Sequence, residues 1–192
     1  AKVSSKPIKL VINTHAHADH FGANEAMARG GATIVSHVTL RERMAKGQHI
    51  AAFNQTVPPS PPAALPTITY ADSMTLHFDG ETIQLFHIKN AHTDSDTLVR
   101  FVRANVIHAS GTFGGDGSYP FFDASSGGSL AGMIAAEEKM LALADENTRI
   151  QADEGDPAST AVLRACRDAL VTIRTRVQKL IDRFLRVEVT AR

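Results

Sequence analysis

The sequence has little cysteine and no excess of charge of either sign. Its one cysteine, Cys166, has no partner for an internal disulfide and cannot supply the several thiolates of a structural zinc site. Any metal must therefore be bound by nitrogen and oxygen atoms. The 20 Lys and Arg residues balance the 20 Asp and Glu residues, so the overall charge does not favour a nucleic acid as partner.

Long apolar runs are also missing. No run reaches the roughly 18 residues of a membrane span, and no positively charged start is followed by an apolar stretch, as in a signal peptide. We therefore expect a soluble protein with no membrane partner. The compartment stays open, because a leader removed before residue 1 would leave no trace.

The composition is typical of a globular protein that buries a full core. Of the 192 residues, 43% are hydrophobic and 21% are charged, which excludes disorder of the whole chain. At this length we expect one domain over residues 1–192. Apolar periodicity predicts strands at residues 8–12, 32–36 and 148–151, an antiparallel meander over 68–108 with a hairpin turn at Asp79-Gly80, and helices at 22–29, 38–46, 129–144 and 158–185.

Two segments are predicted to lack regular structure. Four prolines within residues 58–62 exclude a helix or a central strand, so we expect an extended surface connection over residues 57–66. Residues 111–128 are rich in glycine and predict a long loop, a kind of loop that is usually functional or mobile. Helices on either side of two groups of strands predict a layered α+β domain.

A dense cluster of metal-binding residue types follows the first predicted strand. Three of the nine histidines, His15, His17 and His20, fall within six residues together with Asp19. In an extended segment side chains alternate, so His15, His17 and Asp19 point to one side, while His20 enters from the next helix. Imidazole and carboxylate suit Zn, Fe, Mn or Co. The alternative is a set of surface histidines, but no packing reason places this pattern at a strand end.

A second polar patch, residues 90–96, lies between two predicted strands and contains His92. A lone histidine in such a patch is more often structural than functional. Here the first cluster lacks a third nitrogen ligand, and we therefore expect His92 to complete the site.

The sequence THAHADHFGAN, followed by AHTDSD and later by YPFFD, resembles the metallo-β-lactamase superfamily of zinc hydrolases. The likeness extends from about residue 6 to about residue 180. It implies an αββα sandwich with metal ions at one edge of two facing sheets. By the family's pattern, His15, His17 and His92 would bind a first zinc ion, and Asp19 and His20 would contribute to a second.

The chain departs from the family's pattern at the second metal position. A bridging aspartate in a Gly-Asp pair is replaced by Ser110-Gly111, and a final histidine is replaced within the sequence IQADEGDP, where Glu154 is nearest. Either Glu154 or Asp153 could substitute as a ligand, and Asp116 could reach in for the missing bridge; the other outcome is loss of tight binding there. We thus expect one zinc ion, or another divalent metal, and leave a second ion open.

A further departure lies at the start of the chain. Family members carry several strands before the histidine motif, whereas only residues 1–7 precede the first predicted strand here. We therefore expect the first sheet to be incomplete at its N-terminal side. Because an open edge with apolar surface is a liability, either a second copy covers it in a homo-oligomer or the chain is a fragment of a longer protein.

The predicted chemistry is hydrolysis of a small molecule by a metal-activated water. Three imidazoles leave a fourth position open for water, whose pKa falls toward ~7 on zinc. Asp19 is the candidate to accept the proton of that water, or alternatively to orient a histidine. Tyr119 and Phe121 are candidate substrate-binding residues that would form an apolar wall, unless they pack in the core.

Three functional classes follow from these residues. The first is a hydrolase of a small ester, lactone or β-lactam. The second is a degenerate family member with one metal or none, acting as a binding or scaffold protein, which the altered second site favours. The third is a nuclease or phosphodiesterase, which the neutral charge disfavours.

Overall fold

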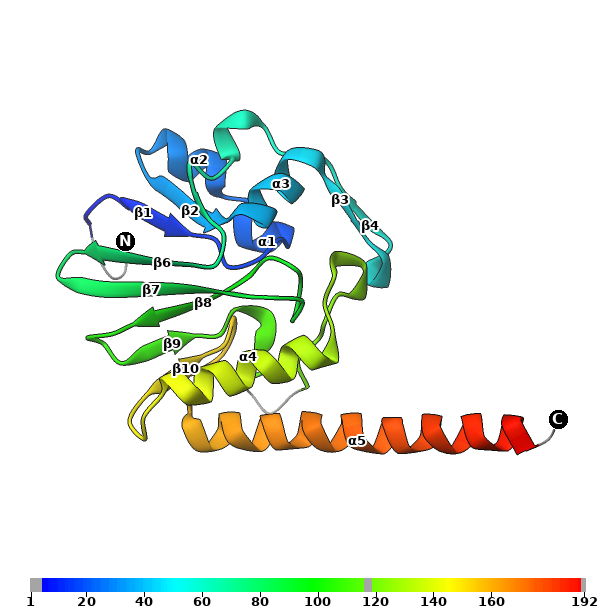
Figure 1. Ribbon diagram of the computed structural model, residues 1–192. Coiled ribbons are helices and arrows are strands. Elements are labelled where there is room, and N and C mark those ends of the chain that lie inside the picture. The colour runs from blue at the N-terminus through cyan, green and yellow to red at the C-terminus, as the bar shows by residue number, and fades with distance from the viewer. Residues whose placement is uncertain (1–4, 116–118, 191–192) are drawn as a thin grey trace.

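The computed structural model describes residues 5–115 and 119–190, which form two facing β-sheets with helices on their outer sides (Figure 1). The first sheet has three parallel strands, in the order β1 (Leu10–Ile12), β2 (Thr33–His37) and β5 (Ile68–Tyr70). The second sheet has six strands, in the order β11 (Ala158–Ser159), β10 (Arg149–Gln151), β9 (Val106–His108), β8 (Asp96–Phe101), β7 (Glu81–Ile88) and β6 (Ser73–Phe78).

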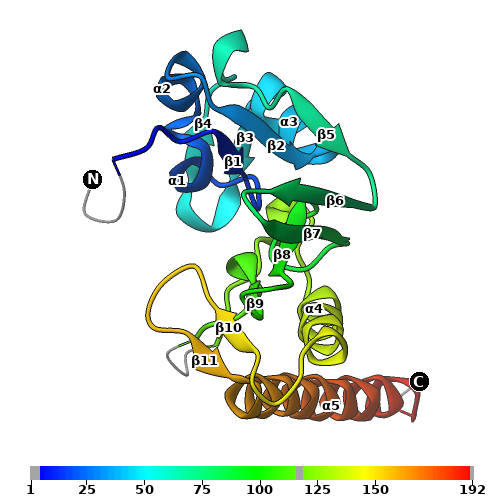
Figure 2. The ribbon, with the colours of Figure 1, turned by 90° about the vertical axis from the view of Figure 1, so that its left-hand side faces the viewer.

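The helices form the two outer layers. Helices α1 (Ala18–Phe21), α2 (Asn24–Arg29) and α3 (Val38–Lys46) lie beside the first sheet, and α4 (Leu130–Leu143) and α5 (Thr160–Thr190) lie beside the second (Figures 1 and 2). A small hairpin of β3 (Gln48–Ile50) and β4 (Gln55–Val57) follows α3 and projects from the layers of the first sheet and its helices. Single 3₁₀ turns are η1 (Ala51–Phe53), η2 (Pro62–Ala64), η3 (Ser110–Thr112) and η4 (Ala124–Ser126). The predicted αββα sandwich is therefore confirmed.

Apolar side chains join the four layers. Val35 and Tyr70 of the first sheet pack against Ile83, Leu85 and Val99 of the second. A larger cluster lies between the second sheet and its helices and contains Leu98, Ile107, Met133, Met140, Ile150, Leu163 and Leu170. Each of these buried side chains contributes about 1.5–3 kcal/mol relative to exposure. The sheets are thus held face to face, and their strand ends form a common edge.

The predicted meander is correct for β6 to β9 and wrong at its start. Strands β6 to β9 pair antiparallel, and the predicted turn places Asp79 and Gly80 at φ 49° and 78°. The segment Ile68–Tyr70, however, pairs parallel with β2 in the first sheet. A parallel neighbour needs a long crossover, and α3, the hairpin and the proline-rich segment supply it.

The first sheet has three strands among the described residues, with β1 at one edge. At the opposite end of the chain, α5 is longer than α4, with 31 residues against 14, and its C-terminal part extends past the rest of the molecule (Figure 1). None of the helices in the described ranges has both the length and the apolar content needed to cross a bilayer.

Candidate metal centre

The ends of several strands meet at one edge of the sandwich and form a pocket of about 580 Å³. The segment after β1 brings His15 and His17 to this pocket, and the segment after β7 brings His92. Asp153 reaches it from the segment after β10. Both sheets therefore contribute side chains to a single cavity.

His15, His17 and His92 converge on a common point. One ring nitrogen from each lies within 4.8 Å of the others, and His17 Nδ1 is 3.0 Å from His92 Nε2. The ring centroids are 4.6–5.0 Å apart, with each pair of rings nearly perpendicular. Nitrogen ligands of a tetrahedral zinc ion, each ~2.0–2.1 Å from the metal, are about 3.3 Å apart. This donor set therefore fits a zinc ion.

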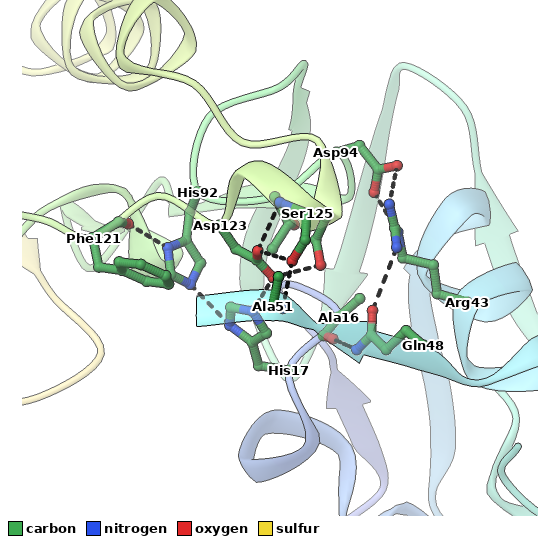
Figure 3. A network of polar contacts seen from close by, with 12 residues as sticks. Ala16, His17, Arg43, Gln48, Ala51, His92, Asp94, Phe121, Asp123 and Ser125 are labelled. Atoms are coloured by element: carbon green, nitrogen blue, oxygen red, sulfur yellow. Dashed lines mark hydrogen bonds and ion pairs between the residues drawn. The ribbon is translucent and has the colours of Figure 1, made fainter. Parts of the chain in front are cut away.

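The outward-facing nitrogens of the three rings all have hydrogen-bonding partners. His17 Nε2 lies 3.3 Å from Asp123 Oδ2, and His92 Nδ1 donates to the carbonyl oxygen of Phe121 over 2.6 Å (Figure 3). His15 Nδ1 is 3.0 Å from Ser110 Oγ. Such outer partners fix the orientation and tautomer of metal-binding imidazoles. Ser110, which occupies part of the altered Gly-Asp pair, thus supports a candidate ligand.

The surroundings keep His15 and His92 neutral, which is the form that binds a metal ion. Burial, aided by the neighbouring histidines, lowers the pKa of His15 well below its usual 6.5. Burial likewise lowers the pKa of His92 to about 4, against the opposing effect of its hydrogen bond to Phe121. Their side chains are only 1% and 8% exposed.

A second group of ligand atoms adjoins the first. Atoms of His15, His20 and Asp153 lie within 4.8 Å of one another, and His20 Nε2 is 3.7 Å from Asp153 Oδ2. Asp153 Oδ1 is buried without a hydrogen-bond partner, and burial raises the pKa of this carboxyl group. A buried unpaired oxygen is costly, and a cation at this point would give it a partner. The residues here thus fit a second divalent ion.

The other residues singled out in the sequence lie around these groups. Asp19 is next to His20, with Oδ2 3.4 Å from His20 Nε2, but its side chain is 79% exposed. Glu154 lines the pocket without belonging to either group of ligand atoms, and its neighbour Asp153 occupies that place. Asp116 lies outside the described residues.

Aromatic side chains stand at the pocket mouth rather than in the core. Tyr119 and Phe121 line the pocket and are 67% and 41% exposed. The ring of Phe53, at the tip of the β3–β4 hairpin and 65% exposed, lies 5.4 Å from that of Phe121. Nothing local in the sequence distinguishes Phe53, which reaches the pocket mouth only through the placement of the hairpin.

Asp123 is a second residue whose place in the site the local sequence does not indicate. Its side chain is 1% exposed and accepts hydrogen bonds from the Ser125 backbone N–H and from Ser126 Oγ, besides its contact with His17. Burial opposes ionisation, but these hydrogen bonds prevail and lower the pKa of Asp123 to about 2. Its position after the sequence YPFF is only an indirect signal, because the aromatic residues are the distinctive part of that motif.

The layered fold and the histidine cluster together define an α/β sandwich with a candidate metal site at the edge of its two sheets. A family model described as the metallo-beta-lactamase superfamily matches residues 1–143. The chain therefore belongs to the metallo-β-lactamase superfamily.

Solved structures have the same fold. A metallo-β-lactamase from Pontibacter korlensis aligns with a TM-score of 0.68 at 17% identity, over 86% of this chain and 70% of that one. The structure of VMB-1 aligns with a TM-score of 0.68 at 11% identity, over 90% and 72%. The B3 metallo-β-lactamase BLEG-1 gives 0.68 at 16% identity, over 88% and 80%. At these identities the likeness concerns the fold.

Proposed function

We propose that the protein is a metal-dependent hydrolase that acts on a small ester, lactone or β-lactam. The observation that carries this proposal is the convergence of one nitrogen each from His15, His17 and His92, from two distant parts of the chain. Three protein ligands and an open position are typical of catalytic rather than structural zinc sites. Membership of a superfamily rich in hydrolases supports the same reaction class.

His15, His17 and His92 would hold the zinc ion. When bound, the ion lowers the pKa of a coordinated water and polarises the substrate's carbonyl oxygen. Asp19 lines the pocket beside His20, and its exposed carboxylate is the residue we propose as acceptor for the proton of that water. The rings of Tyr119 and Phe121 would contact the apolar part of the substrate.

We further propose that His20 and Asp153 bind a second ion. The buried, unpaired Oδ1 of Asp153 and the 3.7 Å separation of its Oδ2 from His20 support this assignment. A carboxylate in place of an imidazole makes the site more oxygen-rich, which favours Mn or Fe more than a purely nitrogen site does.

A second candidate function is that of a degenerate, non-catalytic member of the superfamily. It is favoured by Ser110-Gly111, which leaves no carboxylate at the bridging position. The two candidates differ in metal content and turnover, because a scaffold needs neither.

The test is elemental analysis of the purified chain, with hydrolysis assays on a chromogenic ester, a lactone and a β-lactam. We expect at least one zinc ion per chain and turnover that a chelator abolishes. His17→Ala should lose both metal and activity, whereas His77→Ala, a change at an exposed histidine of strand β6, should keep both. Turnover that survives complete metal removal would refute the mechanism, and a metal-free, inactive chain would favour the scaffold.

A further inference from the structure

The segment Phe121–Asp123 contacts the outer side of two candidate ligands that come from different parts of the chain. The Phe121 carbonyl accepts from His92 Nδ1, and the Asp123 carboxylate faces His17 Nε2 (Figure 3). The Asp123 backbone N–H also donates to the carbonyl of His92 over 2.8 Å. Through Asp123, this segment therefore ties the side chain of one ligand to the backbone of the other.

The Asp123 carboxylate is itself held on several sides. Oδ1 accepts from the backbone N–H of Ser125 over 2.9 Å and from the Ser125 hydroxyl. Oδ2 accepts from Ser126 Oγ over 2.5 Å and lies 3.3 Å from His17 Nε2. Ser125 Oγ in turn accepts from the backbone N–H of Ala51, at the hairpin. The carboxylate thus has a fixed orientation, and its side chain is 1% exposed.

An ionised carboxylate can only accept hydrogen bonds, so its neighbour His17 must carry its proton on Nε2. The other ring nitrogen, Nδ1, then has a free lone pair, and it is Nδ1 that lies 3.0 Å from His92 Nε2 in the centre of the histidine cluster. The opposite tautomer would place a proton on Nδ1, where the ion must bind.

We propose that Asp123 is a positioning residue, which holds the His17 imidazole in the orientation and Nε2–H tautomer that direct Nδ1 at the metal. The inference rests on the proposed metal centre and adds to it a residue that touches neither the ion nor the substrate. Its failure is distinguishable from failure of the proposed hydrolase, because the tests below measure the tautomer and metal affinity rather than turnover.

The first test uses Asp123→Asn. An amide either presents its NH₂ group to His17, which favours the wrong tautomer, or presents its oxygen to His17 and its NH₂ group to the N–H of Ser125. We expect the dissociation constant for zinc, from competition with a chromophoric chelator, to rise about 10–100-fold, which is the usual effect of removing such a partner. A value within threefold of the unaltered protein would overturn the proposal.

A matched control is Asp145→Asn. Asp145 makes the same type of turn, with Oδ1 accepting from the backbone N–H two residues on over 2.8 Å, but it lies after α4, away from the pocket. Its substitution should leave zinc affinity unchanged. Urea unfolding of the two metal-free variants compares how much stability each loses when the hydrogen bonds of its turn are removed. Equal losses of zinc affinity in the two variants would contradict a specific role for Asp123.

The second test needs no substitution and therefore holds even if the Asp123→Asn variant does not fold. Long-range ¹H–¹⁵N spectra of the metal-free protein, labelled at histidine and recorded near pH 8, report the tautomer of each ring directly. We expect the Nε2–H form at His17, with assignment by comparison to His17→Ala. Finding the Nδ1–H form would refute the proposal whatever the enzymatic activity.

Discussion

Gly111 lies against the ring of His92 so closely that even a methyl group has no space there. A Cβ atom added at Gly111 would be 2.4 Å from Cδ2, 2.7 Å from Cγ and 2.7 Å from Nε2 of His92, where ordinary contacts begin near 3.4 Å. In Gly111→Ala the ring must therefore move by about 1 Å, or the backbone after β9 must shift. Crowding of this kind usually costs ~1–3 kcal/mol of folding free energy.

The displaced ring is a candidate ligand, so the change should weaken metal binding as well as stability. His92 Nδ1 is fixed by its 2.6 Å hydrogen bond to Phe121, and a shift of the ring breaks either this bond or the alignment of Nε2 with His17. We expect Gly111→Ala to raise the zinc dissociation constant at least ~10-fold, and to lower kcat up to ~100-fold, as for other misplacements of this size.

The assay combines chelator competition for zinc with urea unfolding of the metal-free protein. Gly30→Ala is the matched control: Gly30 ends α2 at φ −76°, and an added Cβ would meet the carbonyl oxygen of Met27 at 3.3 Å. This control should change neither quantity appreciably. If Gly111→Ala bound zinc within threefold of the unaltered protein at unchanged stability, the position assigned to His92 would be wrong.

Three further changes test other parts of the structure. Asp153→Asn should reduce the metal content at excess metal from two ions to one per chain, and retention of both ions by elemental analysis would exclude Asp153 as a ligand. Burial raises the pKa of Glu137 from 4.5 to about 7. The folded state therefore binds this proton more tightly than the unfolded state, and stability falls as the pH rises from 4.5 to 7. Glu137→Gln should reduce this pH-dependent loss of stability by up to about 3 kcal/mol. Urea unfolding at pH 5 and pH 8 measures the free energy of unfolding at each pH. An equal change between the two pH values in the unaltered protein and in Glu137→Gln would contradict the prediction. Metal removal should lower the melting temperature, because zinc at 100 times its dissociation constant adds about 2.7 kcal/mol; a melting temperature unchanged by a chelator would contradict binding to the folded state.

Local patterns predicted much of the fold because they concern neighbours in sequence. The helix expected at residues 38–46 is Val38–Lys46, and the Asp79-Gly80 turn has the positive φ angles that its residues favour. Strand partners across the chain were harder, since the β-branched run at Ile68–Tyr70 fits either sheet equally well. Only the crossover geometry assigns it to β2. The hairpin at residues 48–57 has no strong turn signal and was not predicted.

In the candidate site, too, local sequence patterns predicted some residues, and others depended on the tertiary fold. The spacing of His15 and His17 already indicated a shared metal, and His92 joins them in the structure. Which acidic residue reaches His20 depended on the path of the segment after β10, and the sequence could not separate Asp153 from Glu154. The role proposed for Asp123 depends on one contact with a ring more than a hundred residues away in sequence, so no local spacing could reveal it.

Because the candidate ligands come from the segment after β1 in the first sheet and the segment after β7 in the second, the proposed ion would crosslink the two sheets of the sandwich. The geometry of the metal site would then depend on how the two sheets pack against each other, through buried contacts such as those of Val35 and Leu85. If the proposed hydrolase is correct, substitutions that tilt one sheet relative to the other would change catalysis without altering any residue of the pocket, and a new substrate preference could then arise from changes within the core.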